Sequence, residues 1–149
     1  MEAAGTTGKK EKHLGRILGL DVGDVRIGSA LSDLLMITAQ GLETYTRKDE
    51  QADIEHFCEI IKANDVDKIV CGLPKNMNGT LGEQAEKVQA FAEKLREASG
   101  LPLIYWDERL TTKSAHRTLI EADMSRKKRK AVVDKIAAVY ILQGYMDSL

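Results

Sequence analysis

Asp21 stands at the end of an apolar segment, where an acidic side chain is costly unless something neutralises it. The preceding residues, 16–20, form a short apolar run that gives way to turn-forming residues, which indicates a buried strand. By the two-residue period of a strand, Asp21 shares one face with Ile17 and Gly19. The sequence leaves two interpretations open: a functional carboxylate at the carboxyl end of a strand, or an acid that caps a turn with Gly23.

A second acidic position closes another apolar segment, residues 101–106, with Asp107 and Glu108. Adjacent residues of a strand point to opposite faces, so at most one of these acids is expected to face the same side as Asp21. Alternation does not choose between them, because the chain can already be turning at this point. In the alternative interpretation, both acids solvate the strand end and pair with Arg109.

Asp134 is the third acid, and its neighbours make it informative. Ala138 and Ile141 follow it by four and seven residues, which places Asp134 on the packed face of a predicted last helix. The small residues Ala137 and Ala138 would let this helix lie close to a sheet. The alternative is a first-turn acid stabilised by the helix dipole, an effect of at most about 1 kcal/mol when exposed.

Carboxylates brought together from these positions would need a cation. Two of them about 4 Å apart repel by roughly 4 kcal/mol at the effective dielectric constant of a protein surface. Oxygen ligands with no accompanying His or Cys favour Mg²⁺ or Mn²⁺ over zinc. One or two such ions can activate a water molecule and stabilise the leaving oxygen in phosphodiester cleavage. We therefore predict a site for Mg²⁺ or Mn²⁺ built from Asp21, Asp134 and one acid of the 107–108 pair.

Basic and hydrogen-bonding residues near these acids predict contacts with phosphate groups. Residues 126–130 are five consecutive cations near the start of the last helix, where positive charge opposes the helix dipole, and a phosphate backbone would relieve their repulsion. The loop 72–80 offers one cation and several hydrogen-bonding groups, although it lacks the Gly-Lys-Ser/Thr ending of a P-loop. A solvated basic segment and an ordinary connecting loop are the alternatives. The residues expected to bind nucleic acid are Arg26, Lys75, Asn76, Asn78, Arg109, Thr111, Arg126, Lys127, Lys128, Arg129 and Lys130.

A mixed sheet would bring these residues together. Apolar patterns predict an antiparallel meander of three strands, followed by two further strands that alternate with helices. The predicted strands are 16–20, 26–31, 36–46, 68–71 and 101–106, and the predicted helices end near Asn64 and at Gly100 or cover 111–122 and about 130–147. We expect the first, fourth and fifth strands to end close together, where ligands of open α/β sheets bind.

Composition is typical of one globular domain. The chain has 149 residues, of which 43% are apolar, and a formal net charge of −1. We expect a disordered tail over 1–15, without the hydrophobic region of a secretory signal, and one domain over 16–149. No apolar run approaches the roughly 20 residues needed to cross a bilayer, so no membrane partner is expected. Cys58 and Cys71 lie far apart in apolar segments, which predicts buried free thiols in a reducing, cytoplasmic compartment, and the scattered histidines lack the spacing of a zinc site.

Several short motifs, taken together and in order, resemble one known family. They are Gly19-Leu20-Asp21-Val22-Gly23, Arg26-Ile27-Gly28, Gly72-Leu73-Pro74, Asn78-Gly79-Thr80, Asp107-Glu108-Arg109-Leu110-Thr111-Thr112 and Asp134-Lys135-Ile136-Ala137-Ala138. The chain resembles the YqgF family of RNase H-like proteins, whose members are described as pre-16S rRNA nucleases and as Holliday junction resolvases. Each motif is short, but their ordered combination is specific and extends from about Arg16 to the C-terminus.

The resemblance implies an RNase H-like fold and a nuclease activity. It maps the catalytic, metal-binding acids of the family onto Asp21, Glu108 and Asp134, and so favours Glu108 over Asp107. The family has Gly72 at the end of the fourth strand, where many RNase H-like nucleases have a carboxylate, so one and two metal ions both remain open. Processing of the 5′ end of pre-16S rRNA is the implied activity, with four-way DNA junctions as the alternative substrate.

Two further hypotheses compete with a nuclease. The first is a non-catalytic factor that binds nucleic acid during ribosome assembly. The second is a phosphotransferase, because actin-like ATPases also open with an Asp-x-Gly turn between two strands, but those enzymes close two domains around ATP. One domain of this length cannot form such a cleft alone. The sequence does not distinguish a monomer from a homodimer.

Overall fold

The computed structural model describes residues 15–110 and 126–149, and over 126–133 it describes the backbone only. A single five-stranded sheet organises this part of the chain, with strand order β4-β3-β2-β5-β6. The first three strands are antiparallel neighbours, and β5 and β6 run parallel to β2. Their bounds are Arg16–Val22 for β2, Arg26–Ser32 for β3, Ala39–Thr46 for β4, Val66–Leu73 for β5 and Leu103–Asp107 for β6. The predicted five-stranded mixed sheet is confirmed.

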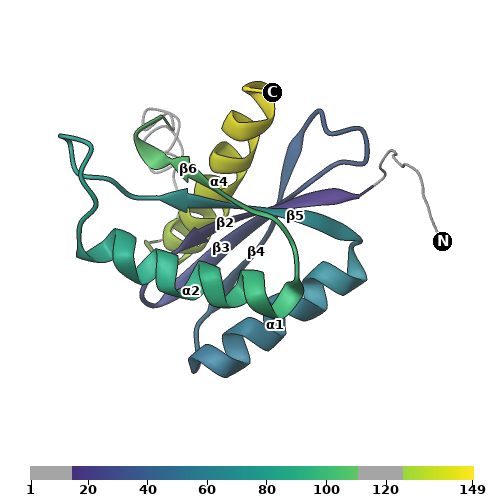
Figure 1. Cartoon of the computed structure of the whole chain (residues 1–149), viewed down its shortest axis with the longest axis horizontal. Coiled ribbons are helices and arrows are strands. Elements are labelled where there is room, and N and C mark those ends of the chain that lie inside the picture. The colour runs from purple at the N-terminus through teal and green to yellow at the C-terminus, as the bar shows by residue number, and fades with distance from the viewer. Residues whose placement is uncertain (1–14, 111–125) are drawn as a thin grey trace.

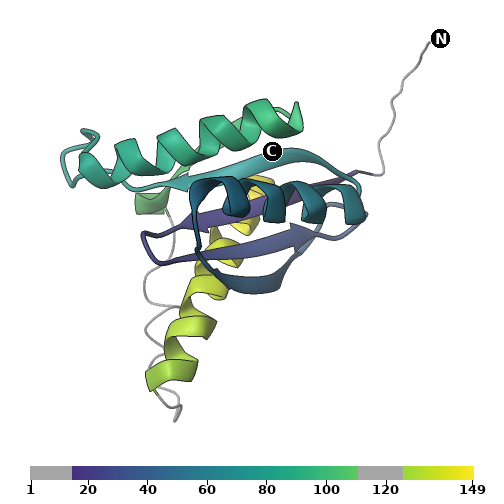
Figure 2. The ribbon, with the colours of Figure 1, turned by 90° about the horizontal axis from the view of Figure 1, so that it is seen from below.

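Helices cover both faces of the sheet (Figures 1 and 2). Helices α1 and α2 pack on one face, and α4 crosses the other. Figure 2 shows the beginning of α4 extending beyond the strands. The bounds are Glu50–Ala63 for α1, Glu83–Ser99 for α2 and Arg126–Asp147 for α4, with a short 3-10 helix, η1, over Glu108–Leu110 after β6. Gly100 ends α2 at φ 72°, as predicted for a left-handed C-terminal position.

Two boundaries differ from the predictions by three residues or more, and several strand ends differ by one or two. The third strand begins at Ala39 and not at Met36, because Met36 has φ 61° in a turn whose backbone amides bond to Asp33. A residue in this left-handed region cannot continue a strand. The last helix begins at Arg126, about four residues earlier than predicted, so the basic run forms its first turns.

Some predictions lie outside the described residues. They are the tail over 1–14 and the helix over 111–122, which includes Thr111. Cys71 is buried and free as predicted, whereas Cys58 is free and only partly buried. Within residues 15–110 and 126–149, no helix combines the length and apolar character needed to cross a membrane.

The two faces of the sheet bury separate apolar clusters. One lies beneath α1 and α2 and includes Phe57 and Phe91, which are almost completely buried. The other lies beneath α4, where Ile17 and Val70 of the sheet meet Leu142 of the helix. Successive residues of a strand therefore pack against different helices, those on one face against α1 and α2 and those on the other against α4.

Candidate active site

Asp21 is the most strongly perturbed acid at the carboxyl edge of β2. Its side chain is partly buried on the α4 side of the sheet, and its residue pairs with Gly28 of β3. Burial, and then the negative charges of Glu108 and Asp134, raise the pKa of Asp21 from 3.8 to about 7. No hydrogen bond or ion pair joins its carboxylate to another described side chain. Asp21 is therefore an acid whose charge the described fold leaves uncompensated.

Glu108, and not Asp107, lies on the same side of the sheet as Asp21. Trp106 packs in the cluster beneath α4, and Glu108 follows it by two residues at the start of η1. A Cβ atom on Gly72 of the neighbouring strand would lie 2.4 Å from Cδ1 of Ile141 and 3.0 Å from Cγ of Glu108, so the glycine leaves room for both side chains. Burial, and then the charge of Asp107, raises the pKa of Glu108. The geometry thus separates two adjacent acids that strand alternation alone does not.

Asp134 reaches this edge from α4 because the helix lies almost on the strand backbone. A Cβ atom on Gly28 would overlap the carbonyl oxygen of Asp134, so only glycine permits this approach. Since Gly28 is the direct partner of Asp21 in the sheet, the backbone of Asp134 lies over the strand beside Asp21. The carboxylate of Asp134 forms an ion pair with Arg26 and accepts a hydrogen bond from it, with 2.6 Å between Nε and Oδ2.

The charges of Glu108 and Asp134 act on Asp21, but the three acids do not form a finished metal site. Among residues 15–110 and 134–149, no group of three His, Cys, Asp or Glu side chains is arranged to hold a metal ion. The donors are nonetheless oxygen atoms only, which fits Mg²⁺ or Mn²⁺ in chemistry. Among the side chains that the structure describes, Asp21 and Glu108 meet no compensating charge, as expected of ligands that require a cation, whereas Asp134 already has a guanidinium partner.

Residues predicted to bind phosphate gather around Asp107. Arg109 donates to both carboxylate oxygens, with Nη2 2.7 Å from Oδ2, and Nζ of Lys75 lies 4.0 Å from Oδ2. The hydrogen bonds from Arg109 hold the pKa of Asp107 below its ordinary value. Arg109 also donates to the backbone oxygen of Met77, which joins it to the loop after β5. Lys75 and Arg109 are thus neighbours, and both lie beside the carboxylate of Asp107.

The two asparagines of this loop are engaged in holding its shape. Asn76 donates through Nδ2 to Oγ1 of Thr80 at 2.9 Å, and Oδ1 of Asn78 accepts from both the hydroxyl and the amide of Thr80. Gly79 completes the turn at φ 87°. The loop is therefore a closed turn that presents Lys75 and its backbone.

The remaining predicted residues divide between the site and the parts that are not described. Arg26 lies at Asp134, inside the acidic group and not on a separate phosphate surface. The backbones of Arg126 to Lys130 form the first turns of α4, but their side chains lie outside the described residues, as does Thr111.

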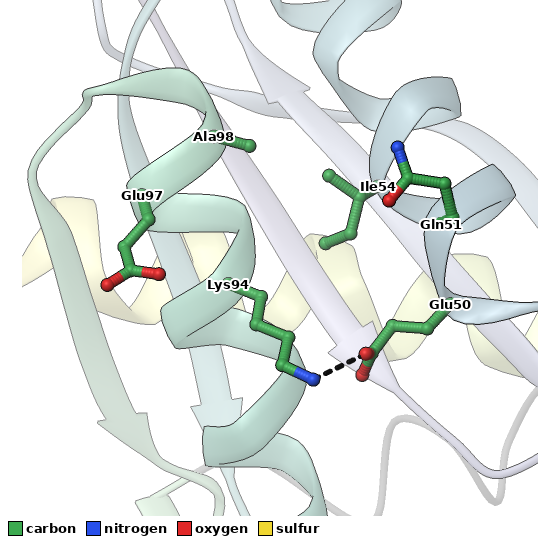
Figure 3. A pocket seen from close by; sticks show the side chains of 6 residues that line it. All are labelled: Glu50, Gln51, Ile54, Lys94, Glu97 and Ala98. Atoms are coloured by element: carbon green, nitrogen blue, oxygen red, sulfur yellow. Dashed lines mark hydrogen bonds and ion pairs between the residues drawn. The ribbon is translucent and has the colours of Figure 1, made fainter.

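A groove elsewhere on the molecule does not belong to this group. It lies between α1 and α2, on the opposite face of the sheet from α4 (Figure 3). An ion pair between Lys94 and Glu50 crosses it, with 2.5 Å between Nζ and Oε1. Its lining residues are Glu50, Gln51, Ile54, Lys94, Glu97 and Ala98. None of the predicted site residues lines it.

A known protein family matches the chain over almost all of its described length. A family described as "RuvX: Holliday junction resolvase" matches residues 15–148. The chain belongs to the RuvX family. Among curated relatives, proteins of Clostridium acetobutylicum and Clostridioides difficile are each 58% identical to it, over 134 and 133 residues. These matches cover 90% and 89% of the RuvX chain and 99% and 94% of the relatives, which are both named "Putative pre-16S rRNA nuclease". The RuvX chain is thus a nuclease, an enzyme that hydrolyses phosphodiester bonds.

Solved structures of low sequence identity share its fold. RuvC of T. thermophilus, solved in complex with a Holliday junction substrate, matches with a TM-score of 0.60 at 10% identity, covering 90% of the RuvX chain and 94% of RuvC. The fowlpox virus Holliday junction resolvase matches with a TM-score of 0.54 at 15% identity, covering 90% and 99%. These similarities confirm the predicted RNase H-like fold.

Analysis of the sequence missed two features of the RuvX site. The contact between Arg26 and Asp134 joins residues 108 positions apart, and no local pattern signals it. The second feature is the room that Gly72 leaves for Glu108, together with the identity of the backbone that approaches Gly28, which is that of Asp134. Here a signal exists, because glycine inside a strand often marks a close approach of another backbone or side chain.

Proposed function

We propose that this RuvX-family protein is a nuclease that depends on Mg²⁺ or Mn²⁺ and uses Asp21, Glu108 and Asp134 as its catalytic acids. The observation that carries the proposal is the uncompensated charge of Asp21, whose pKa is raised to about 7 by burial and by the other two acids. A cluster of acids that destabilises its own ionised form is expected to bind a cation. The nuclease domain is proposed to cover residues 16–149.

The three acids would hold one or two divalent ions at the carboxyl edge of β2. When bound, such an ion supplies Lewis-acid stabilisation of the charge that develops on phosphate oxygens. The protein's own residues bind and orient the substrate. Arg109 and Lys75 are suited to phosphate groups, because a guanidinium fork and an ammonium group favour anionic oxygens. The basic first turns of α4 would extend this surface along the nucleic-acid backbone.

We infer that the substrate is precursor 16S rRNA, processed at its 5′ end in the cytoplasm during ribosome biogenesis. The names of the relatives that are 58% identical support this substrate. A four-way DNA junction is the second candidate, because the matched family is described as a Holliday junction resolvase. Resolution of a four-way junction generally needs two active sites, so a homodimer would favour DNA and a monomer would favour RNA.

The test is a cleavage assay with the full chain, a precursor 16S rRNA fragment and a four-way DNA junction, each with Mn²⁺ or with EDTA. Asp21→Asn is expected to lower cleavage by at least about 10²-fold, because it removes a metal-binding carboxylate. Asp24→Asn is the matched control: it removes the same charge three residues away, from a side chain that is 60% exposed and 3.7 Å from Lys87. This control is expected to cleave like the unmodified protein.

Cleavage by Asp21→Asn at the rate of the unmodified protein would rule out the proposed mechanism. Tight binding of either substrate without cleavage in Mg²⁺ and in Mn²⁺ would replace it with a non-catalytic assembly factor. The preferred substrate is the one for which the rate in Mn²⁺ is greater. Sedimentation of the same samples gives the oligomeric state.

A further inference from the structure

Arg26 and Asp134 form the ion pair that distinguishes Asp134 from the other two acids. Nε of Arg26 lies 2.6 Å from Oδ2 of Asp134, and their side chains remain 32% and 23% exposed. Arg26 opens β3 and Gly28 follows two residues later on the same face, where it lets the backbone of Asp134 lie against the strand. The close approach of α4 therefore brings this arginine within reach of Asp134.

The positive charge of Arg26 is not shared equally among the three acids. Asp21 and Glu108 are uncompensated within the described residues, and each has a raised pKa. Asp134 has the guanidinium of Arg26 directly on one carboxylate oxygen. A positive charge thus already stands at the acid whose carboxylate would otherwise be free for an ion. A divalent ion that takes Asp134 as a ligand must share that oxygen with Arg26 or displace it.

We propose that Arg26 is a positioning residue that exchanges partners: it neutralises Asp134 until a divalent ion binds, and then turns to a phosphate group of the substrate. The inference rests on the proposed role of Asp134 as a metal ligand. Two physical facts support the exchange. The planar guanidinium fork binds carboxylates and phosphates equally well in geometry. The pair is also partly exposed, so the side chain can rotate without opening the core.

Metal affinity without substrate distinguishes this exchange from a fixed structural role. Titration of the full chain with Mn²⁺, followed by calorimetry or by the electron paramagnetic resonance of the free ion, measures it. Arg26→Gln is expected to tighten Mn²⁺ binding on the order of fivefold, because the ion no longer competes with a partly exposed ion pair. Arg26→Lys keeps the charge but loses the guanidinium fork. Its Mn²⁺ affinity is expected to lie between those of the unmodified protein and Arg26→Gln.

Lys135→Gln is the matched control for charge. It removes one positive charge from the residue next to Asp134, but the side chain of Lys135 lies over Gly41 of β4. The effect of Arg26→Gln beyond that of Lys135→Gln is therefore due to the direct pair and not to the general field. Thermal unfolding of each variant verifies that it is folded.

Binding of nucleic acid gives the second readout. A labelled precursor 16S rRNA fragment is titrated in EDTA and in Ca²⁺, an ion that also prefers oxygen ligands. If the ion releases Arg26, Arg26→Gln is expected to weaken RNA binding about threefold or more in Ca²⁺ and to change it little in EDTA. An equal loss in both conditions contradicts the exchange.

The outcomes separate this inference from the proposed function. If Mn²⁺ binding depends on Asp21 but Arg26→Gln weakens it, or changes it no more than Lys135→Gln does, Arg26 is a fixed clamp for Asp134 and the exchange is wrong. The nuclease proposal then still stands. If the unmodified protein binds no Mn²⁺, or if Asp21→Asn binds Mn²⁺ with the same affinity as the unmodified protein, the metal site and the exchange are both rejected.

Discussion

Asp21 and Asp53 lie on opposite sides of one sheet, where Asp21 is partly buried and Asp53 almost completely buried, and they differ in what surrounds them. Asp53 is 1% exposed and accepts hydrogen bonds from the amide of Lys48, from Nε of Arg47 and from the hydroxyl of Tyr45, at 2.9 to 3.0 Å. Burial raises the pKa of Asp53, but these bonds outweigh it and hold the pKa below 3.8. Asp21 has no such donors among the described residues, and its pKa rises to about 7. The hydrogen-bond donors around an acid, and not its burial alone, therefore decide whether its pKa rises or falls.

The hydrogen-bond network of Asp53 also reaches the turn that follows Asp21. Arg47, the partner of Asp53, donates from Nη1 to the backbone oxygen of Gly23 at 3.0 Å, and its guanidinium lies 4.9 Å from the ring centroid of Phe91. Gly23 is two residues beyond Asp21, in the turn that leads to Arg26. The network around Asp53 thus fixes the turn between two residues of the candidate site.

The largest effect on stability is expected at Asp53, whose carboxylate accepts these hydrogen bonds. Asp53→Asn should lower the free energy of unfolding by about 3 kcal/mol, because it leaves Arg47 largely buried without its anion. Urea unfolding at pH 7 measures this loss. Glu50→Gln, in the first turn of the same helix, breaks an exposed pair with Lys94 and should lower it by less than about 0.5 kcal/mol. Similar losses in the two variants would show that the network around Asp53 has no special role.

A smaller loss is expected where α4 rests on the strands. Gly28→Ala should lower the free energy of unfolding by about 2 kcal/mol, because the new Cβ atom overlaps the carbonyl oxygen of Asp134 and displaces the helix. It should also lower nuclease activity, since Asp134 moves away from Asp21. Gly82→Ala is the control, with its nearest neighbouring atom 3.3 Å from the new Cβ. Urea unfolding and the cleavage assay, applied to both variants, test the contrast.

The fold could be predicted from the sequence more fully than the site. Periodicity predicted the five strands and the antiparallel meander of the first three, because each apolar face repeats over several residues. Strand alternation does not choose between Asp107 and Glu108, and in the sequence only the family resemblance favours Glu108, because the choice depends on the residue at which β6 ends and η1 begins. The last helix begins at Arg126, earlier than the predicted start near Lys130, although consecutive cations disfavour a first turn.

The electrostatic character of the two buried acids was not predictable either. Asp53 was not singled out, because its donors come from β4 and from the residues that follow this strand, and nothing in the helical pattern of α1 signals them. The pairing of Arg26 with Asp134 likewise arises only when α4 is packed on β3. A sequence indicates where acids are buried more readily than which partners meet them.

The smallest effect concerns the uncompensated acid itself and depends on pH. The folded state holds a proton on Asp21 with a pKa of about 7, whereas the unfolded state holds it at 3.8, so the metal-free protein loses stability as pH rises through this window. Asp21→Asn should remove that loss: a shift of this size represents roughly 4 kcal/mol for a fully buried group, and because Asp21 is only partly buried we expect the variant to be more stable by about 1 kcal/mol at pH 8 and equally stable at pH 4. Urea unfolding in EDTA at both values measures the difference, and Mn²⁺ at pH 8 should stabilise only the unmodified protein. A variant that is less stable at pH 8 would mean that Asp21, like Asp53, has donors of its own.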